Sequence, residues 1–148
     1  MMAQRPYLGF GLRHVALQVQ DLEACEAFYV GLLGMRVEWR PDADNLYLTS
    51  GGDNLALHRV SEAPADTGQR LDHIGFMLAS AEAVDQWYVW LREQGVPTAG
   101  APRTHRDGAR SFYCFDPEGT RVQLIHHPPI CAHEADDPTL EVDAIDGM

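Results

Sequence analysis

Two segments of the chain repeat one alternation of apolar and polar residues. LRHVALQV begins at Leu12, and LDHIGFML begins 59 residues later at Leu71. Apolar residues at every second position predict a β-strand with one face in the core. The other face of each strand is small and polar, and it begins with His14 in the first copy and His73 in the second. The repeat therefore predicts two equivalent strands, each with a histidine on its non-core face.

A helix is expected after each of these strands. Asp21 and Ser80 are suitable N-caps, and Gly34 and Gly95 are suitable C-terminal residues. Between caps and glycines, apolar residues recur at helical spacing. These stripes are Leu22, Cys25, Phe28, Leu32 and Leu33 in the first helix, and Val84, Trp87, Tyr88 and Leu91 in the second.

Three short strands complete each copy. In the first they are predicted at about 35–40, 45–50 and 54–60, and in the second at about 96–98 or slightly later, 109–115 and 120–126. Asp116-Pro-Glu-Gly119 is a strong turn signal between the last two strands. The order predicts two βαβββ units, about 10–60 and 71–127, within one domain of residues 1–128.

Composition fits a globular protein. Hydrophobic residues make up 45% and charged residues 22% of the 148 residues. We find neither an apolar run of ~18 residues nor a basic region followed by an apolar stretch, so we expect no membrane partner and a cytoplasmic location. Three cysteines form neither a disulfide framework nor a zinc motif.

The net charge of −11 is concentrated in an acidic C-terminal tail, residues 129–148, which contains six acidic residues and no Lys or Arg. Nucleic acid is not expected as a partner, because phosphate binding requires a basic surface. The tail is either an interaction segment or a solvated, partly disordered end, and composition favours the second interpretation.

These features resemble the vicinal oxygen chelate superfamily, which includes glyoxalase I, extradiol dioxygenases, fosfomycin-resistance transferases and bleomycin-resistance proteins. The resemblance covers about 12–127 and depends on the paired histidines, the FY…LLGM segment and FYCFDPEGTRVQL. It implies an α+β fold in which two βαβββ units form a curved mixed sheet around a cavity, with helices on the outer face. It also implies a homodimer.

The resemblance implies that His14, His73 and Gln123 hold a divalent metal ion, Fe²⁺, Mn²⁺, Zn²⁺ or Ni²⁺. Gln123 stands where the family usually has Glu, and a neutral amide is expected to weaken metal binding. A fourth ligand position of the family falls on Ala56, which cannot bind a metal. This departure argues against the glyoxalase I pattern.

Two further residues are candidates for catalysis. The resemblance places Tyr113 in the pocket, where its hydroxyl could bond a substrate oxygen or steer proton transfer. A tyrosine that packs across strands is an equally good interpretation. His105 lies where extradiol dioxygenases carry a catalytic histidine, although an ordinary loop histidine is the favoured interpretation.

Two other residues are assigned to the substrate pocket together with Ala56. His58 lies two positions after Ala56 and therefore shares its strand face, where a histidine at the rim is favoured. Arg103, with Arg106 and Arg110, could hold an anionic substrate, and a solvated loop is the simpler alternative.

Two functions remain open. The first is a metal-dependent enzyme, a lyase, an isomerase or a ring-cleaving dioxygenase, acting on a small oxygen-bearing substrate. Ala16 argues against fosfomycin transfer, because that subfamily has a hydroxyl residue two positions after the first histidine. The second is a metal-free protein that binds a small molecule or drug, as bleomycin-resistance proteins do, and the acidic net charge suits a cationic ligand.

Overall fold

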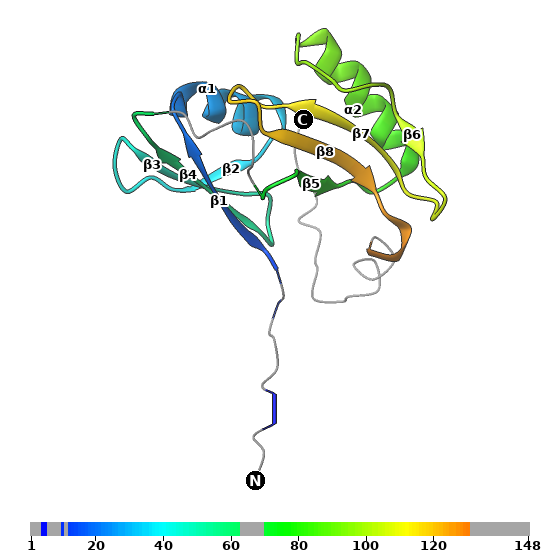
Figure 1. Ribbon diagram of the computed structural model, residues 1–148, viewed down its shortest axis with the longest axis horizontal. Helices are drawn as coiled ribbons and strands as arrows, with labels where there is room; N and C mark the ends of the chain where they lie inside the picture. The colour runs from blue at the N-terminus through cyan, green and yellow to red at the C-terminus, as the bar shows by residue number, and fades with distance from the viewer. Residues whose placement is uncertain (1–3, 6–9, 11, 63–69, 131–148) are drawn as a thin grey trace, which may run out of the picture. The chain divides into compact units, whose positions relative to one another are not determined.

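The computed structural model describes residues 4–5, 10, 12–62 and 70–130. The chain divides into two compact units, Met1–Gly68 (unit 1) and Gln69–Met148 (unit 2). The acidic tail beyond residue 130 and most of the predicted linker lie outside the described residues. Each unit contains one four-stranded mixed sheet (Figure 1), so the predicted α+β class is confirmed.

Unit 1 follows the predicted order of a strand, a helix and three strands. Its sheet has the order β1-β4-β3-β2, in which β1 and β4 are parallel and the other neighbours antiparallel. The elements are β1 (His14–Val19), α1 (Leu22–Glu26), η1 (Ala27–Leu32), β2 (Arg36–Trp39), β3 (Asn45–Thr49) and β4 (Asn54–Arg59).

Unit 2 repeats this topology, with the order β5-β8-β7-β6 and a parallel β5–β8 pair. The elements are β5 (Ile74–Met77), α2 (Ala81–Glu93), β6 (Arg103–Thr104), β7 (Arg110–Phe115) and β8 (Arg121–His126). The strand predicted at 96–98 is reduced to a single bridge between Thr98 and Cys114, and β6 follows it. Pro97 and Pro102 lack an N–H group, and Gly100 has a positive φ of 83°, so this segment cannot pair continuously.

The alternation of the strands places the core on the helix-facing side of each sheet. In unit 1 the buried residues include Leu55 and Leu57 of β4, and this strand contacts α1. In unit 2 the ring of Tyr88 on α2 packs edge-on against Phe112 of β7, with the ring centroids 5.3 Å apart. The opposite side of each sheet, called the open face below, carries the polar residues.

Both predicted helix caps are present. The Asp21 carboxylate accepts a hydrogen bond from the backbone N of Ala24 at 3.0 Å, and the Ser80 hydroxyl accepts one from Ala83 at 3.1 Å. The first helix then widens into a π-helix, η1, in which Leu33 N donates to Phe28 O at 3.0 Å. This bond spans five residues, a spacing that the apolar stripe did not predict.

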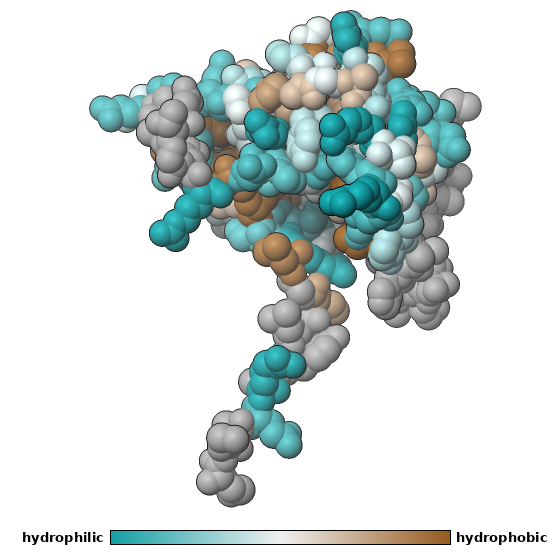
Figure 2. Space-filling model, turned by 45° about the vertical axis from the view of Figure 1, so that its right-hand side comes forward, coloured by the Kyte–Doolittle hydropathy of each residue, from teal (hydrophilic) through white to brown (hydrophobic). Residues whose placement is uncertain are grey.

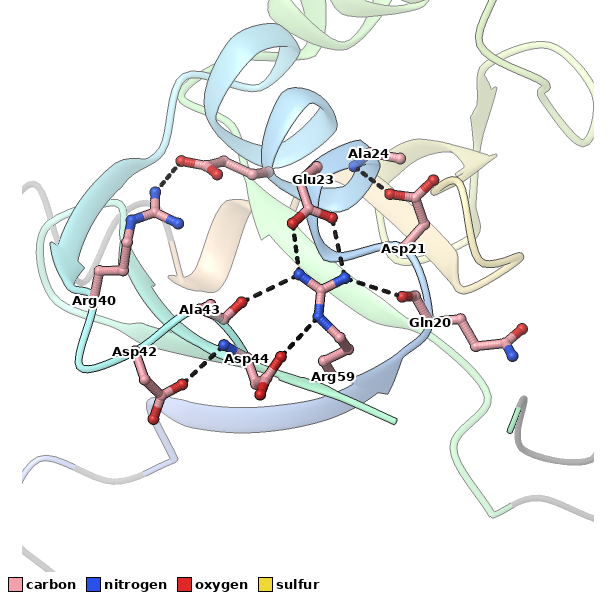
Figure 3. Close-up of polar contacts among 10 residues, drawn as sticks. Gln20, Asp21, Glu23, Ala24, Arg40, Asp42, Ala43, Asp44 and Arg59 are labelled. Carbon is pink, nitrogen blue, oxygen red and sulfur yellow. Dashed lines mark hydrogen bonds and ion pairs between the residues drawn. The ribbon is translucent and has the colours of Figure 1, made fainter. Parts of the chain in front are cut away.

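Arg59 fastens the end of β4 in unit 1 (Figure 3). Its guanidinium donates to both carboxylate oxygens of Glu23, at 2.5 and 3.1 Å, and to Asp44 at 3.0 Å. It also donates to the carbonyls of Ala43 and Gln20. The hydrogen bond from Arg59 lowers the pKa of Glu23. One side chain thus joins the start of α1 to the loop between β2 and β3.

The surface mixes polar and hydrophobic side chains (Figure 2). Large hydrophobic residues that are exposed within their unit include Trp39 and Val37 on β2 and Trp90 on α2. Within the parts of the chain that the structure describes, no helix is both long enough and apolar enough to cross a membrane.

Candidate functional site

The strand register gives Ala56 and Gln123 equivalent positions in the two units. Ala16 of β1 pairs with Ala56 of β4, and Gly75 of β5 pairs with Gln123 of β8. The assignment of Ala56 to the position that corresponds to Gln123 therefore agrees with the backbone. Ala56 is 1% exposed and its side chain has no polar atom. It therefore offers the open face of unit 1 no group that could bind a metal.

Three of the predicted site residues come together on the open face of unit 2. Tyr113 of β7 pairs with Gln123 of β8, and Gln123 Nε2 donates to the Tyr113 hydroxyl at 3.3 Å. The ring of His73 lies edge-on to Tyr113, with the ring centroids 5.2 Å apart. The guanidinium of Arg121 lies 5.6 Å from the centre of the Tyr113 ring. His73, Tyr113 and Gln123 thus form one polar group.

Gly75 leaves space beside the amide of Gln123. A Cβ placed at Gly75 would lie 3.7 Å from both Gln123 Oε1 and Ile125 Cγ2. Because Gln123 Nε2 is directed at Tyr113, the amide oxygen is the atom of Gln123 that can bind a cation. Gln123 is only 9% exposed, so its amide is held in place by its surroundings.

His73 has one ring nitrogen in a hydrogen bond. His73 Nδ1 lies 2.6 Å from Asp72 Oδ1, and this bond lowers the pKa of Asp72 below its ordinary value of 3.8. Asp72 is therefore a carboxylate at neutral pH, and it accepts a hydrogen bond from the Nδ1–H of His73. In the neutral imidazole this arrangement leaves the lone pair on His73 Nε2, the form that a metal-binding histidine requires.

His14 in unit 1 has a comparable partner. Its Nδ1 lies 2.7 Å from Asn54 Oδ1, and Asn54 Nδ2 donates to Glu38 Oε2 at 3.0 Å. Imidazole nitrogens and an amide oxygen are donors that first-row divalent metals accept, so the predicted ligand set fits such an ion. No group of three or more His, Cys, Asp and Glu residues suited to a metal occurs within residues 12–62 and 70–130 or at the few described positions before them.

The open face of unit 1 also carries His58, which the sequence assigned to the pocket. His58 Nδ1 lies 2.6 Å from Asn45 Oδ1, and its ring lies edge-on to Tyr47, with centroids 5.8 Å apart. Tyr47 pairs with Ala56, as Tyr113 pairs with Gln123, and Trp39 stacks on Tyr47 at 5.1 Å. The sequence analysis did not single out Tyr47, which is the counterpart of Tyr113 in unit 1.

His105 and Arg103 lie near the same face of unit 2 as Tyr113. His105 Nε2 lies 3.0 Å from the hydroxyl of Ser111, which is two residues before Tyr113 on β7 and therefore on the same side. Arg103 pairs with Ser111 across β6 and β7. Arg103 thus lies in this part of the sheet, and His105 lies in the loop between β6 and β7, from which its ring contacts Ser111.

Arg110 does not join Arg103 on the open face, although the sequence allowed an anion-binding cluster of the two. The guanidinium of Arg110 donates to Asp85 Oδ1 on α2, at 2.7 and 3.1 Å, and to the hydroxyl of Thr104. Arg110 alternates with Ser111 along β7 and so faces the helix. Its charge is therefore used within unit 2 and does not meet a substrate on the open face.

Cys114 lies in the core of unit 2, as its position next to Tyr113 predicts. It is fully buried, and burial, with a smaller contribution from Asp116, raises the pKa of its thiol to about 12. A thiol of this kind is not a nucleophile at neutral pH. Cys25 is also buried, and the third cysteine, Cys131, lies outside the described residues.

Comparison with known proteins identifies the family. Residues 11–124 match the sequence model of the Glyoxalase/Bleomycin resistance protein/Dioxygenase superfamily. The match covers most of the chain and both units, and the chain therefore belongs to this superfamily.

Individual relatives agree with this assignment. The chain is 32% identical over 117 residues to the metallothiol transferase FosB of Staphylococcus epidermidis, covering 76% of this chain and 79% of the relative. A glyoxalase family protein of Enterococcus faecalis is 28% identical, with a TM-score of 0.65 over 81% of this chain and 100% of that one. Lactoylglutathione lyase of Agrobacterium tumefaciens shares the fold, with a TM-score of 0.66 over 81% of this chain and 96% of that one, at 22% identity.

Proposed function

We propose that this protein is a metal-dependent enzyme in which His14, His73 and Gln123 hold a divalent cation and Tyr113 contacts a small oxygen-bearing substrate. The observation that supports it best is the group formed by His73, Tyr113 and Gln123 in unit 2. A bound cation would act as a Lewis acid on the substrate oxygens. The proposal requires His14 to converge with the other two ligands, either within one chain or from a second copy in a homodimer.

Each protein group has a distinct task in this proposal. The two histidines supply Nε2 lone pairs, because their Nδ1 atoms are bonded to Asp72 and Asn54. Gln123 supplies its amide oxygen and holds the Tyr113 hydroxyl through its amide nitrogen. That hydroxyl accepts from Gln123 and keeps its own proton, which it can donate to a substrate oxygen.

Among reaction classes, thiol transfer has the most direct support, since the relative in S. epidermidis is named a metallothiol transferase. In such a reaction the thiol loses its proton, a sulfur–carbon bond forms and a carbon–oxygen bond breaks. The released oxygen takes a proton, a step that suits Tyr113. Ala16 stands two residues after His14, where fosfomycin transferases have a hydroxyl residue. We therefore propose an oxygen-bearing acceptor other than fosfomycin, with lyase, isomerase and dioxygenase activities as the competing classes.

A metal-free binding protein is the second candidate. The neutral Gln123 and the apolar Ala56 favour it, because neither brings the negative charge that attracts a divalent cation. Such a protein would bind an organic ligand on the same open faces without chemistry. The two candidates differ in whether metal is taken up and whether a substrate is consumed.

The test is metal content. The chain is purified without chelator and its bound metal determined by mass spectrometry, beside His14→Ala/His73→Ala and a control, His58→Ala. The enzyme proposal predicts close to one divalent ion per chain in the wild type and in the control, and none in the double variant. A wild type that takes up no divalent metal at micromolar concentration contradicts it.

Activity is then assayed on three mixtures: a thiol with an epoxide, methylglyoxal with glutathione, and a catechol with O₂. The proposal predicts turnover of at least one mixture, lost after chelation and restored by metal. Consumption that survives chelation would exclude metal dependence.

A further inference from the structure

Each of the two predicted metal histidines is hydrogen-bonded to a negatively charged group, either directly or through one amide. His73 Nδ1 contacts the Asp72 carboxylate at 2.6 Å. His14 Nδ1 contacts Asn54 Oδ1 at 2.7 Å, and the other end of that amide donates to Glu38. The sequence analysis identified the histidines and none of these three partners.

The chain Glu38–Asn54–His14 fixes which nitrogen of His14 carries the proton. An ionised carboxylate only accepts, so Asn54 must turn its NH₂ group toward Glu38 and its Oδ1 toward His14. Oδ1 also only accepts, so His14 Nδ1 bears a hydrogen, and in the neutral ring the lone pair is on Nε2. Glu38 therefore acts on the far nitrogen of His14 through one intervening residue.

In unit 2 a carboxylate places the hydrogen on Nδ1 of His73 directly, with no amide between them. The Asp72 carboxylate accepts from His73 Nδ1, and it lies 3.9 Å from the guanidinium of Arg121. Asp72 thus places a full negative charge against the ring, partly offset by Arg121. A carboxylate behind a histidine makes the opposite nitrogen a better donor to a metal.

We propose that Asp72 and the Asn54–Glu38 pair supply, from behind His73 and His14, the negative charge and the ring orientation that Gln123 cannot supply as a neutral ligand. The inference rests on the proposed metal site and adds three positioning residues to it. It accounts for how a ligand set without a carboxylate attracts a divalent cation. Asp72 has the larger effect, because its charge touches the ring directly.

Unit 1 contains a matched control. His58 Nδ1 contacts Asn45 Oδ1 at 2.6 Å, and Asn45 Nδ2 donates to Asp42 at 2.9 and 3.1 Å. The hydrogen bonds that link Asp42, Asn45 and His58 have the same donors and acceptors as those that link Glu38, Asn54 and His14. His58 lies four residues after Asn54 on β4, however, which is roughly 13 Å along the strand. Asp42→Asn removes the same charge as Glu38→Gln without touching a proposed ligand.

The experiment titrates Mn²⁺ into the metal-free full chain and follows free Mn²⁺ by electron paramagnetic resonance. Asp72→Asn is expected to weaken binding by about 10- to 100-fold, the range measured for such partners. Glu38→Gln and Asn54→Ala are expected to weaken it by about 3- to 10-fold, because the charge acts through an amide. Asp42→Asn is expected to change it less than about twofold, as a distant exposed charge does.

A second readout needs no metal. Nitrogen-15 spectra of the metal-free chain report which ring nitrogen of each histidine is protonated. We expect the Nδ1–H form for His14 and His73 in the wild type, and a mixture of forms for His14 in Glu38→Gln, since a glutamine can donate as well as accept.

The outcomes separate this inference from the proposed function. If the wild type binds Mn²⁺ and Asp72→Asn and Glu38→Gln bind it equally well, the inference is wrong and the metal site stands. If Asp42→Asn weakens binding as much as Glu38→Gln, overall charge explains the result and the inference is wrong. If the wild type binds no Mn²⁺, the proposed metal site and the inference fail together.

Discussion

The two units share one backbone plan and differ at the residue in the middle of the open face. In unit 2 the last strand presents Gln123 opposite Tyr113, whereas unit 1 presents Ala56 opposite Tyr47. Both copies keep a tyrosine partner, but only one keeps a polar group that can bind a cation. A repeated fold therefore does not imply a repeated site, and the chemistry of this chain is expected to be unequal between its halves.

The units also secure their last two strands differently. In unit 1, Arg59 clamps the end of β4 through Glu23 and Asp44. In unit 2, the Asp116 carboxylate accepts from the backbone N of Glu118 and Thr120, at 2.9 and 2.8 Å, and so fixes the turn before β8. Unit 1 thus adds an exposed ionic network to its own Asp53 turn, whereas unit 2 has the more buried turn carboxylate.

The largest effect is expected where the units are most alike. Leu57 of β4 and Leu124 of β8 follow Ala56 and Gln123 by one residue and are both buried. Each Leu→Ala variant should lower the free energy of unfolding by about 2–5 kcal/mol. Denaturant unfolding measures the loss, and hydrogen exchange should locate it in the unit that carries the variant. A loss below 1 kcal/mol for either would contradict the shared core plan.

Loss of the turn carboxylate should destabilise unit 2 more than unit 1. Asp116→Ala leaves two backbone N–H groups without their acceptor and should cost about 1–2 kcal/mol. Asp53→Ala, in the corresponding turn of unit 1, removes the acceptor of one backbone N–H, that of Ser50, and of the Ser50 and Thr49 hydroxyls. Asp53 is less buried and the freed hydroxyls can bond water, so this change should cost about half as much. Thermal unfolding of both variants checks the order, and a larger loss for Asp53→Ala would reverse the comparison.

The two tyrosines separate site from scaffold. Tyr113→Phe removes the acceptor of Gln123 Nε2 and the proposed proton donor, so kcat should fall about tenfold or more. Tyr47 faces Ala56, which has no polar group, so Tyr47→Phe should leave kcat within about twofold. Steady-state kinetics on whichever of the three assay mixtures the protein turns over measures both. Equal losses would show that Tyr113 has no special role.

Acid should weaken unit 1 through its ionic network, the smallest effect in this series. The hydrogen bond from Arg59 holds the pKa of Glu23 below its ordinary 4.5, and the backbone N–H of Asp44 holds that of Asp42 below 3.8. A depressed carboxyl pKa stabilises the fold above the ordinary value and loses this contribution as pH falls through the folded value.

Thermal unfolding between pH 6 and 3 should therefore show a smaller decline in Tm for Arg59→Met than for the wild type. Arg106→Met, which removes the same charge and leaves both the Arg59–Glu23 and the Arg110–Asp85 pairs intact, is the control and should keep the wild-type slope. Parallel curves for wild type and Arg59→Met would show that Glu23 contributes nothing.

Local patterns predicted most of the fold. Alternation gave the faces of β1 and β5, and the caps Asp21 and Ser80 were read from residue type alone. The wide turn of η1 and the short β6 were not predicted, because they depend on hydrogen bonds and on prolines that interrupt pairing. Such features follow from tertiary context, which single-residue preferences do not contain.

The candidate site was predicted in part for the same reason. Repeat position and family resemblance identified His73, Tyr113 and Gln123, and the structure brings these together. Glu38 and Asn54 lie 16 residues apart on different strands, and nothing in their sequence neighbourhood links them to His14. Partners of this kind become visible only when the register of the sheet is known.

The central claim, that Gln123 is a metal ligand beside His14 and His73, is tested most directly by calorimetric titration of Mn²⁺ into the wild type and Gln123→Glu. The substitution adds a negative charge at an unchanged position of β8. Binding should tighten by roughly tenfold or more, because opposite charges attract strongly away from bulk water. Unchanged affinity in Gln123→Glu would show that this side chain does not touch the metal.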